Sequence, residues 1–217
     1  MKRSLVTVGL LLLVACNFHK EDTTTSIPPI PQSENQIRKE ILRKACKVKH
    51  GLGGGSGSYL TRNWVLTAYH VVSEEVPGIE SMSWVEENGD LVDFRLHRYS
   101  EALDLALLFR DSAPPEEEPT WNGTMAGSVE LGQRVYTAGF PVLQGPYLTD
   151  GYISRLHSTD GMYVSIQATF GSSGSGIYDT QGRLVGVVQQ IWVMRGIPMT
   201  FMLLSCTFDD LRLFLRT

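Results

Sequence analysis

The stretch "FGSSGSGIYDTQGRLVGVV", residues 170–188, starts like a flexible linker and ends like part of a folded core. Runs of glycine and serine usually form solvated connectors, because they bury too little apolar surface to offset the entropy of ordering them. Here, however, the run leads directly into two short apolar strands, predicted over residues 177–179 and 183–188 around a polar turn. The glycines are therefore expected to lie between ordered elements and to shape a turn.

Short apolar runs separated by turn residues continue outward from this stretch and fill the chain from Cys46 onward, a dozen runs in all. This spacing leaves no room for helices between the strands, so it favours antiparallel barrels or a sandwich over an α/β sheet. Helices are expected only at the ends. Ser33 and Gln36 have capping-box spacing before an apolar helical face, which predicts a helix over residues 34–44, and the leucines near the C-terminus indicate a closing helix.

A positive start and a short apolar run predict a secretory signal peptide over residues 1–15. The run is far shorter than the roughly 20 apolar residues that a membrane-spanning helix needs. Its end, "LVAC", resembles a bacterial lipobox, which implies cleavage before Cys16 and lipidation of that cysteine; the alternative is an ordinary signal peptide with an incidental cysteine. More than one acyl chain would give stable anchoring, and residues 16–33, which are polar and carry prolines, would form a tether. We therefore expect an exported protein, lipid-anchored to a bacterial cell membrane at its periplasmic or extracellular face.

The composition limits the size and the partners of the folded part. With 217 residues, 42% of them hydrophobic, the chain can bury one sizeable core or two packed lobes, and residues 34–217 are expected to form one domain. The formal net charge of -4 becomes -6 when Lys2 and Arg3 leave with the signal, so no basic surface favours a nucleic acid partner. Cys46 and Cys206 either form a disulfide or stay as two buried thiols, and without a C-x-x-C pair no zinc or redox site is expected.

Serine hydrolases need a nucleophile, a histidine that takes its proton and a carboxylate that orients the histidine, and the chain order tests which layout applies to Ser173. All five histidines precede this serine: His19, His50, His70, His97 and His157. The order serine, aspartate, histidine of α/β-hydrolases is therefore excluded, and Ser175 also breaks their G-x-S-x-G motif. The only aspartate before His70 is Asp22 in the tether, which excludes the subtilisin order. The order histidine, aspartate, serine remains.

Three motifs in this order resemble those of the trypsin-like (chymotrypsin-fold) serine peptidases, most closely the bacterial HtrA-type and short single-domain members. "VLTAYHVV" matches the histidine motif at His70, "LDLALL" the aspartate motif at Asp104, and "GSSGSG" the nucleophile turn at Ser173. Alone, each residue has a structural explanation, as a core histidine, a partner of Arg110 and a turn serine. Together they favour catalysis. The resemblance covers about residues 45–217 and implies an all-β protein of two packed antiparallel six-stranded β-barrels with short N-terminal and C-terminal helices.

The resemblance also implies roles for individual residues. His70 would be the general base, Asp104 would orient it, and Ser173 would attack the peptide carbonyl. The backbone N–H groups of Gly171 and Ser173 would form the oxyanion hole. Weaker matches imply a substrate-binding set: Gln167, Val188, Gln189 and Gln190. No metal or cofactor is required for this chemistry.

The sequence also departs from the family pattern in the histidine motif and in the nucleophile turn. Tyr69 stands where the family usually has alanine, and Ser175 stands for the second glycine of the nucleophile turn. Ser172 replaces the aspartate that digestive members pair with a freed N-terminus, so activation by that route is not expected. The glycine cluster of residues 51–58 lacks the pattern of a phosphate-binding loop and is predicted to be a hairpin that enters the histidine strand.

The sequence thus predicts a membrane-tethered serine endopeptidase that acts on proteins or peptides. The alternative is a binding lipoprotein that keeps the trypsin-like fold without turnover, which the intact set of His70, Asp104 and Ser173 disfavours. An esterase also stays open, because the same triad cleaves esters.

Overall fold

The computed structural model describes residues 32–73, 82–114, 118, 121, 124–157, 161–194 and 197–216. The expected signal peptide, the lipidation site at Cys16 and most of the tether lie outside these residues. Within the described ranges, no helix is long and apolar enough to cross a membrane.

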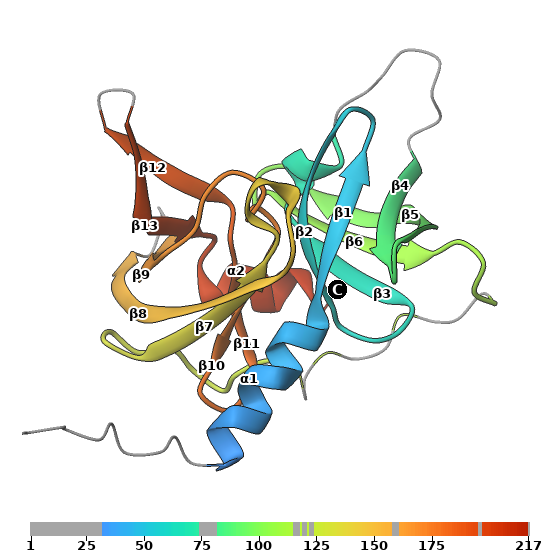
Figure 1. Cartoon of the computed structure of the whole chain (residues 1–217). Coiled ribbons are helices and arrows are strands. Elements are labelled where there is room, and N and C mark those ends of the chain that lie inside the picture. Colours follow the sequence, from blue (N-terminus) through green and yellow to red (C-terminus); the bar gives the residue numbers. More distant parts are fainter. Residues whose placement is uncertain are drawn as a thin grey trace, which may run out of the picture. The chain divides into compact units, whose positions relative to one another are not determined.

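The first barrel closes from six short antiparallel strands (Figure 1). These are β1 (Ala45–His50), β2 (Gly53–Tyr59), β3 (Trp64–Thr67), β4 (Met82–Glu87), β5 (Asp90–Ser100) and β6 (Leu105–Arg110). The strand order is β1-β2-β3-β6-β5-β4, and β1 pairs with β4 to close the ring. Alternate residues of β1 are buried, and Val48 packs with Val65 and Phe94 in a small apolar core. The glycine cluster forms the β1–β2 hairpin, as predicted.

The second sheet is also antiparallel and contains the remaining strands (Figure 1). These are β7 (Arg134–Gly139), β8 (Tyr147–His157), β9 (Gly161–Ile166), β10 (Gly176–Asp179), β11 (Leu184–Val187), β12 (Gln190–Met194) and β13 (Ile197–Ser205). Their order is β11-β10-β7-β8-β9-β13-β12, so the two end strands are neighbours in the chain. Only Val188 and Gln189 separate them.

These two linking residues close the second barrel. Gly174 donates its N–H to the Val188 carbonyl at 2.7 Å, and Gln189 donates its own to the Leu204 carbonyl of β13 at 3.0 Å. Backbone hydrogen bonding therefore passes from β10, the partner of β11, to β13, the partner of β12. The strands β11 and β12 together act as one bent strand. The second sheet is a six-stranded barrel with one strand broken in two, which confirms the all-β, two-barrel fold class.

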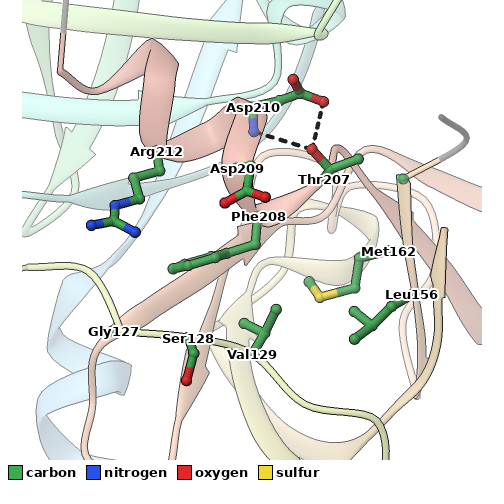
Figure 2. Close-up of a pocket in the computed structure, with 11 residues that line it drawn as sticks. Gly127, Ser128, Val129, Leu156, Met162, Thr207, Phe208, Asp209, Asp210 and Arg212 are labelled. Carbon is green, nitrogen blue, oxygen red and sulfur yellow. Dashed lines mark hydrogen bonds between the residues drawn. The ribbon is translucent and has the colours of Figure 1, made fainter. Parts of the chain in front are cut away.

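The predicted closing helix is α2 (Phe208–Phe214), and its start is capped. The Thr207 hydroxyl accepts a hydrogen bond from the Asp210 N–H at 3.1 Å, as expected of a threonine before a helix. A cavity of about 580 Å³ lies beside this helix start, with an apolar wall that includes Val129 and Met162 (Figure 2). None of the predicted catalytic residues lines this cavity among its described residues.

Both cysteines of the folded part are free and buried, so no disulfide joins them. Cys46 lies in the core of the first barrel, and Cys206 lies in the larger apolar cluster, which contains the core of the second barrel and extends to β3 and β6 of the first. Burial raises the pKa of both thiols, that of Cys206 to about 12. Because the thiolate is the reactive form, both side chains are unreactive in the folded chain.

Helix α1 (Gln32–Lys44) begins two residues earlier than predicted, so Ser33 lies inside its first turn and not before it. The helix leads directly into β1 (Figure 1). Ile41 is fully buried and Ile37 packs against the large cluster that holds the core of the second barrel. The helix therefore packs on the folded domain and is not part of a free tether.

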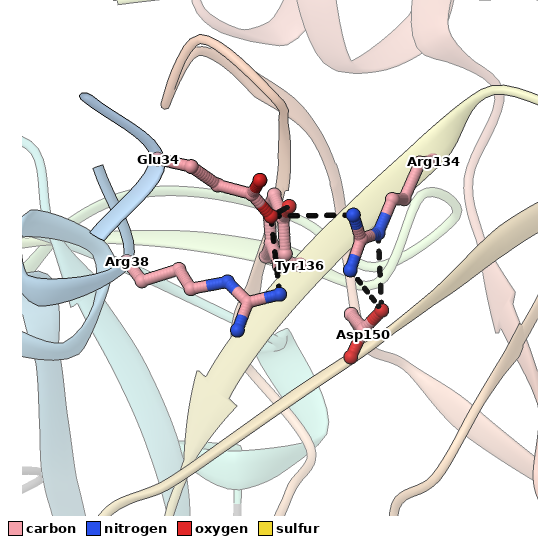
Figure 3. A network of polar contacts seen from close by, with 5 residues as sticks. All are labelled: Glu34, Arg38, Arg134, Tyr136 and Asp150. Atoms are coloured by element: carbon pink, nitrogen blue, oxygen red, sulfur yellow. Dashed lines mark hydrogen bonds and ion pairs between the residues drawn. The ribbon is translucent and has the colours of Figure 1, made fainter. Parts of the chain in front are cut away.

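A polar network joins the start of α1 to the second barrel (Figure 3). Glu34 Oε1 accepts hydrogen bonds from the Tyr136 hydroxyl at 2.5 Å and from Arg134 at 3.2 Å, and it pairs with Arg38 at 3.1 Å. Arg134 also pairs with Asp150 at 3.0 Å. The Tyr136 hydrogen bond, with the charges of the two arginines, holds the pKa of Glu34 below its usual range against partial desolvation.

Replacing Glu34 with glutamine should remove a pH-dependent part of the stability. The pKa of Glu34 is lower in the folded chain, so its contribution is complete above the unfolded pKa and is lost as pH falls through the folded pKa. In thermal melts between about pH 6 and about pH 3, Glu34→Gln should therefore lose less Tm than the wild type. Gln36→Met, at an exposed position of the same helix, changes no titrating group; it is the control and should lose as much as the wild type. An equal loss for Glu34→Gln and the wild type would contradict the prediction.

Candidate active site

His70 and Asp104 lie next to each other although 34 positions separate them in the chain. His70 is in the 3-10 turn η1 (Tyr69–Val71), which follows β3, and Asp104 ends the turn that leads into β6, the neighbour of β3. His70 Nδ1 lies 2.8 Å from Asp104 Oδ2, and the His70 backbone N–H donates to Asp104 Oδ1 at 2.9 Å. Both carboxylate oxygens thus hold the histidine. Arg110, the alternative partner of this aspartate, pairs with Glu87 instead.

Ser173 lies in an ordered turn between β9 and β10, in which most backbone amides have acceptors. The amides of Ser172, Gly174 and Ser175 donate to carbonyls of the turn and its neighbours: Thr169, Val188 and Ser172. Within the described part of the chain, the amides of Gly171 and Ser173 donate to no protein group. Gly171 and Gly174 have φ angles of 89° and 88°, which glycine adopts without the strain of a side chain. The two implied oxyanion donors are therefore the ones left unpaired.

The direction of the Gly171 N–H follows from the carbonyl before it. The Phe170 carbonyl accepts a hydrogen bond from the Val142 N–H at 2.6 Å. Because the C=O and N–H of one trans peptide point in opposite directions, the Gly171 N–H points away from Val142. Val142 lies in the short helix η2 (Pro141–Leu143) with a φ of 48°, a strained conformation for a β-branched residue. The strained backbone at Val142 thus fixes the direction of the Gly171 N–H, one of the two unpaired donors.

Ser56 of β2 attaches the first barrel to this turn. Its backbone N–H donates to the Ser173 carbonyl at 2.7 Å. Its hydroxyl donates to the Gly171 carbonyl at 2.7 Å and accepts from the Phe140 N–H at 2.8 Å. Ser56 is fully buried. The sequence places this serine only in a hairpin and does not reveal its role, because no local pattern indicates a contact across 115 positions of the chain.

Gly55, next to Ser56, lies close to both the histidine turn and the serine turn. A Cβ atom at Gly55 would lie 2.7 Å from the Ser173 carbonyl oxygen and 2.8 Å from a methyl group of Val71, the residue after His70. The two turns therefore both lie against the backbone of β2 at Gly55. No hydrogen bond joins the Ser173 hydroxyl to His70 among the described residues, so this contact stays a prediction. Such catalytic hydrogen bonds are often long before substrate binds.

Three of the residues with an implied role in substrate binding lie around the break between β11 and β12. Val188 and Gln189 are buried, and Gln190 is exposed. The side-chain amide of Gln189 donates hydrogen bonds to the backbone carbonyls of Leu103 and Asp104. This contact with the aspartate turn was not predicted from the sequence.

Gln167, the fourth of these residues, is exposed and lines a cavity of about 360 Å³ beside the nucleophile turn. Ser172 and Ser175 line the same cavity from the turn itself, and Tyr147 lines it from β8. The described residues around this cavity carry no charge. A side chain that entered it would therefore meet hydroxyl, amide and apolar groups.

The other described histidines with placed side chains have structural partners. His50 is buried and lies 3.2 Å from the Ser83 hydroxyl, and His97 lies 3.3 Å from Glu118 and packs edge-on against Trp64. Among the described residues, no group of three or more His, Cys, Asp or Glu side chains is placed to hold a metal ion.

Comparison with known proteins places this geometry in a family. Residues 55–187 match the model of the trypsin-like peptidase domain. Among solved structures, the inactive form of a serine mutant of Rv3671c from M. tuberculosis is similar with a TM-score of 0.65 and 17% identity over 82% of this chain and 89% of that one. A serine endoprotease from Yersinia pestis is similar with a TM-score of 0.63 and 21% identity over 82% of this chain and 64% of that one. No curated protein sequence matches the chain. The family match covers more than half of the chain, which therefore belongs to the trypsin-like peptidases, a family of serine endopeptidases.

Proposed function

We propose that this trypsin-like peptidase hydrolyses peptide bonds through Ser173, His70 and Asp104 while tethered to a bacterial membrane by lipidated Cys16. The observation that carries the catalytic part is the pair of His70 and Asp104, held by two hydrogen bonds beside the turn of Ser173. A histidine oriented by a carboxylate is what a serine nucleophile needs as its base. The unpaired amides of Gly171 and Ser173 add the donors that an oxyanion requires.

The reaction would proceed in two halves. His70 takes the proton of the Ser173 hydroxyl as its oxygen bonds to the peptide carbonyl carbon, and the carbonyl oxygen becomes an oxyanion facing the two unpaired amides. His70 then gives this proton to the leaving amine as the C–N bond breaks. Water, deprotonated by His70, attacks the resulting ester, and the proton returns to Ser173. Asp104 stabilises the imidazolium in both halves.

The membrane tether is proposed from the sequence of the first 16 residues alone. A positive start, a short apolar run and "LVAC" are typical of a lipoprotein signal. The folded domain begins with α1 at Gln32, so residues 16–31 would span the distance between the membrane and the domain. Mass spectrometry of the membrane fraction should identify Cys16 as a lipid-modified N-terminus, and any other mature N-terminus would contradict the tether.

The substrate is proposed to be a protein or peptide, with Gln167 among the residues that contact it. The exposed amide of Gln167 and the uncharged lining of the cavity beside it favour uncharged side chains over lysine or arginine at the position before the cut. A binding lipoprotein without turnover and an esterase are the competing functions. A matched pair of ester and peptide amide substrates separates an esterase from a peptidase.

Labelling with a fluorophosphonate probe tests the catalytic proposal directly. The wild type should be labelled and Ser173→Ala should not, because the probe reacts only with an activated serine. Ser128→Ala removes an exposed hydroxyl at a position distant in sequence from Ser173. It is the control and should be labelled like the wild type. Labelling of Ser173→Ala would place the nucleophile elsewhere, and an unlabelled wild type would support a binding function.

A further inference from the structure

Gln189 contacts the aspartate turn and not the solvent. The residue is 6% exposed, and its Nε2 atom donates to the carbonyl of Leu103 and to the carbonyl of Asp104, the latter at 3.1 Å. Its backbone N–H is also used, because it donates to Leu204. A primary amide has two N–H donors on one nitrogen, and Gln189 uses this nitrogen for two adjacent carbonyls of the same turn.

The backbone that Gln189 contacts is strained. Asp104 has a φ of 49°, in the left-handed region that residues with a side chain seldom adopt. Such a conformation persists only where the surrounding structure holds it in place. The turn has two local hydrogen bonds, from Asp104 N–H to the Glu101 carbonyl and from Leu103 N–H to the Ser100 hydroxyl. In both bonds the turn residue is the donor, so the carbonyls of Leu103 and Asp104 stay available to accept from Gln189.

The orientation of the Asp104 carboxylate depends on this backbone. One carboxylate oxygen accepts from the His70 backbone N–H at 2.9 Å and the other lies 2.8 Å from His70 Nδ1. A rotation of the backbone about Asp104 would move both oxygens together, and catalytic groups tolerate only small errors of position. Gln189 is 85 positions away in the chain and belongs to the second barrel. The contact therefore couples the second barrel to the histidine–aspartate pair of the first.

We infer that Gln189 is a positioning residue, which holds Asp104 in its strained conformation so that both carboxylate oxygens face His70. The effect on turnover rests on the proposed function, whereas the effect on the hydrogen bond between His70 and Asp104 does not. The role also explains why a glutamine and not a shorter polar residue stands here. Its amide must cross from the second barrel to reach two carbonyls of the first.

The spectroscopic signature of the pair gives the first test. The Nδ1 proton of His70, bound to a carboxylate, should give a strongly downfield proton resonance in the wild-type protein. Methionine has a side chain of similar length to glutamine and no donor, so Gln189→Met should move or remove this resonance. The control Gln36→Met, at an exposed helical position, should leave it unchanged. Should Gln189→Met fold poorly, Gln189→Leu also removes both donors without burying a charge, with the same expected loss. An unchanged resonance in a folded Gln189 variant would overturn the inference.

Kinetics then separate positioning from substrate contact. Gln189→Met should lower kcat by about 10²-fold with little change in KM, as a small displacement of a catalytic group does. In an Asp104→Ala background the same substitution should have almost no further effect, because Gln189 acts through Asp104. An equal fold-loss in both backgrounds would overturn the inference. If the wild type proved inactive but the resonance changed as expected, the proposed function would fail and the positioning role would stand.

Discussion

Asp104→Asn should lower kcat by about 10⁴-fold and leave the fold unchanged, as the equivalent loss of a triad carboxylate does. The structure gives the physical reason. Asp104 accepts from the His70 backbone N–H with one oxygen and from Nδ1 with the other. An asparagine has only one oxygen, so its amide nitrogen must face one of the two donors. The histidine then loses its orientation or takes the tautomer that cannot accept the proton of Ser173.

The measurement is steady-state cleavage of a peptide substrate, with thermal melts to show that the variant is folded. Asp93→Asn, at an exposed position on β5, is the matched control and should retain wild-type kcat. A value of kcat for Asp104→Asn within about tenfold of the wild type would contradict the assignment of the triad carboxylate.

The antiparallel strands were predictable because the sequence alternates short apolar runs with turn residues, which is a local pattern. That pattern did not distinguish barrels from a sandwich, and the two-barrel arrangement was predicted only from the resemblance to the trypsin-like peptidases. The predicted strands at residues 177–179 and 183–188 correspond to β10 and β11. The break between β11 and β12 was not predictable, because "RLVGVVQQIW" is a single apolar run. The strand ends at Val187 because its hydrogen-bonding partner changes from β10 to β13. That change depends on tertiary structure.

The same difference applies to the candidate site. His70, Asp104 and Ser173 were identified because each lies in a recognisable local motif, and the structure pairs the first two. For Ser56 the sequence predicted only a place in a hairpin, and for Gln189 only a weakly supported role in substrate binding. Their contacts cross 115 and 86 positions of the chain, and both contact the backbone of residues predicted to act in catalysis. Serine and glutamine are common in turns and on surfaces, so only the folded chain distinguishes these two from solvated residues.

Gly171→Ala should lower kcat by on the order of 10²–10³-fold, the effect of losing one oxyanion donor. Gly171 has a φ of 89°, and a Cβ there would lie 2.6 Å from the Phe140 carbonyl oxygen, 2.9 Å from the Val142 nitrogen and 3.0 Å from the Leu143 nitrogen. All three atoms belong to the backbone, so no side chain can rotate away. The peptide between residues 170 and 171 must therefore turn, which weakens the hydrogen bond from Val142 to Phe170 and redirects the Gly171 N–H.

Gly132→Ala separates this contact from the general strain of placing alanine at positive φ. Gly132 has a φ of 79°, and beyond its chain neighbours no described atom lies within 4 Å of the place that a Cβ would take. Alanine there therefore costs about 1 kcal/mol in backbone strain and meets no contact. Both variants should lose a similar part of Tm from this strain, but only Gly171→Ala should lose kcat, with KM nearly unchanged because the oxyanion forms after binding. If the two variants lost kcat equally, the Gly171 N–H would not be an oxyanion donor.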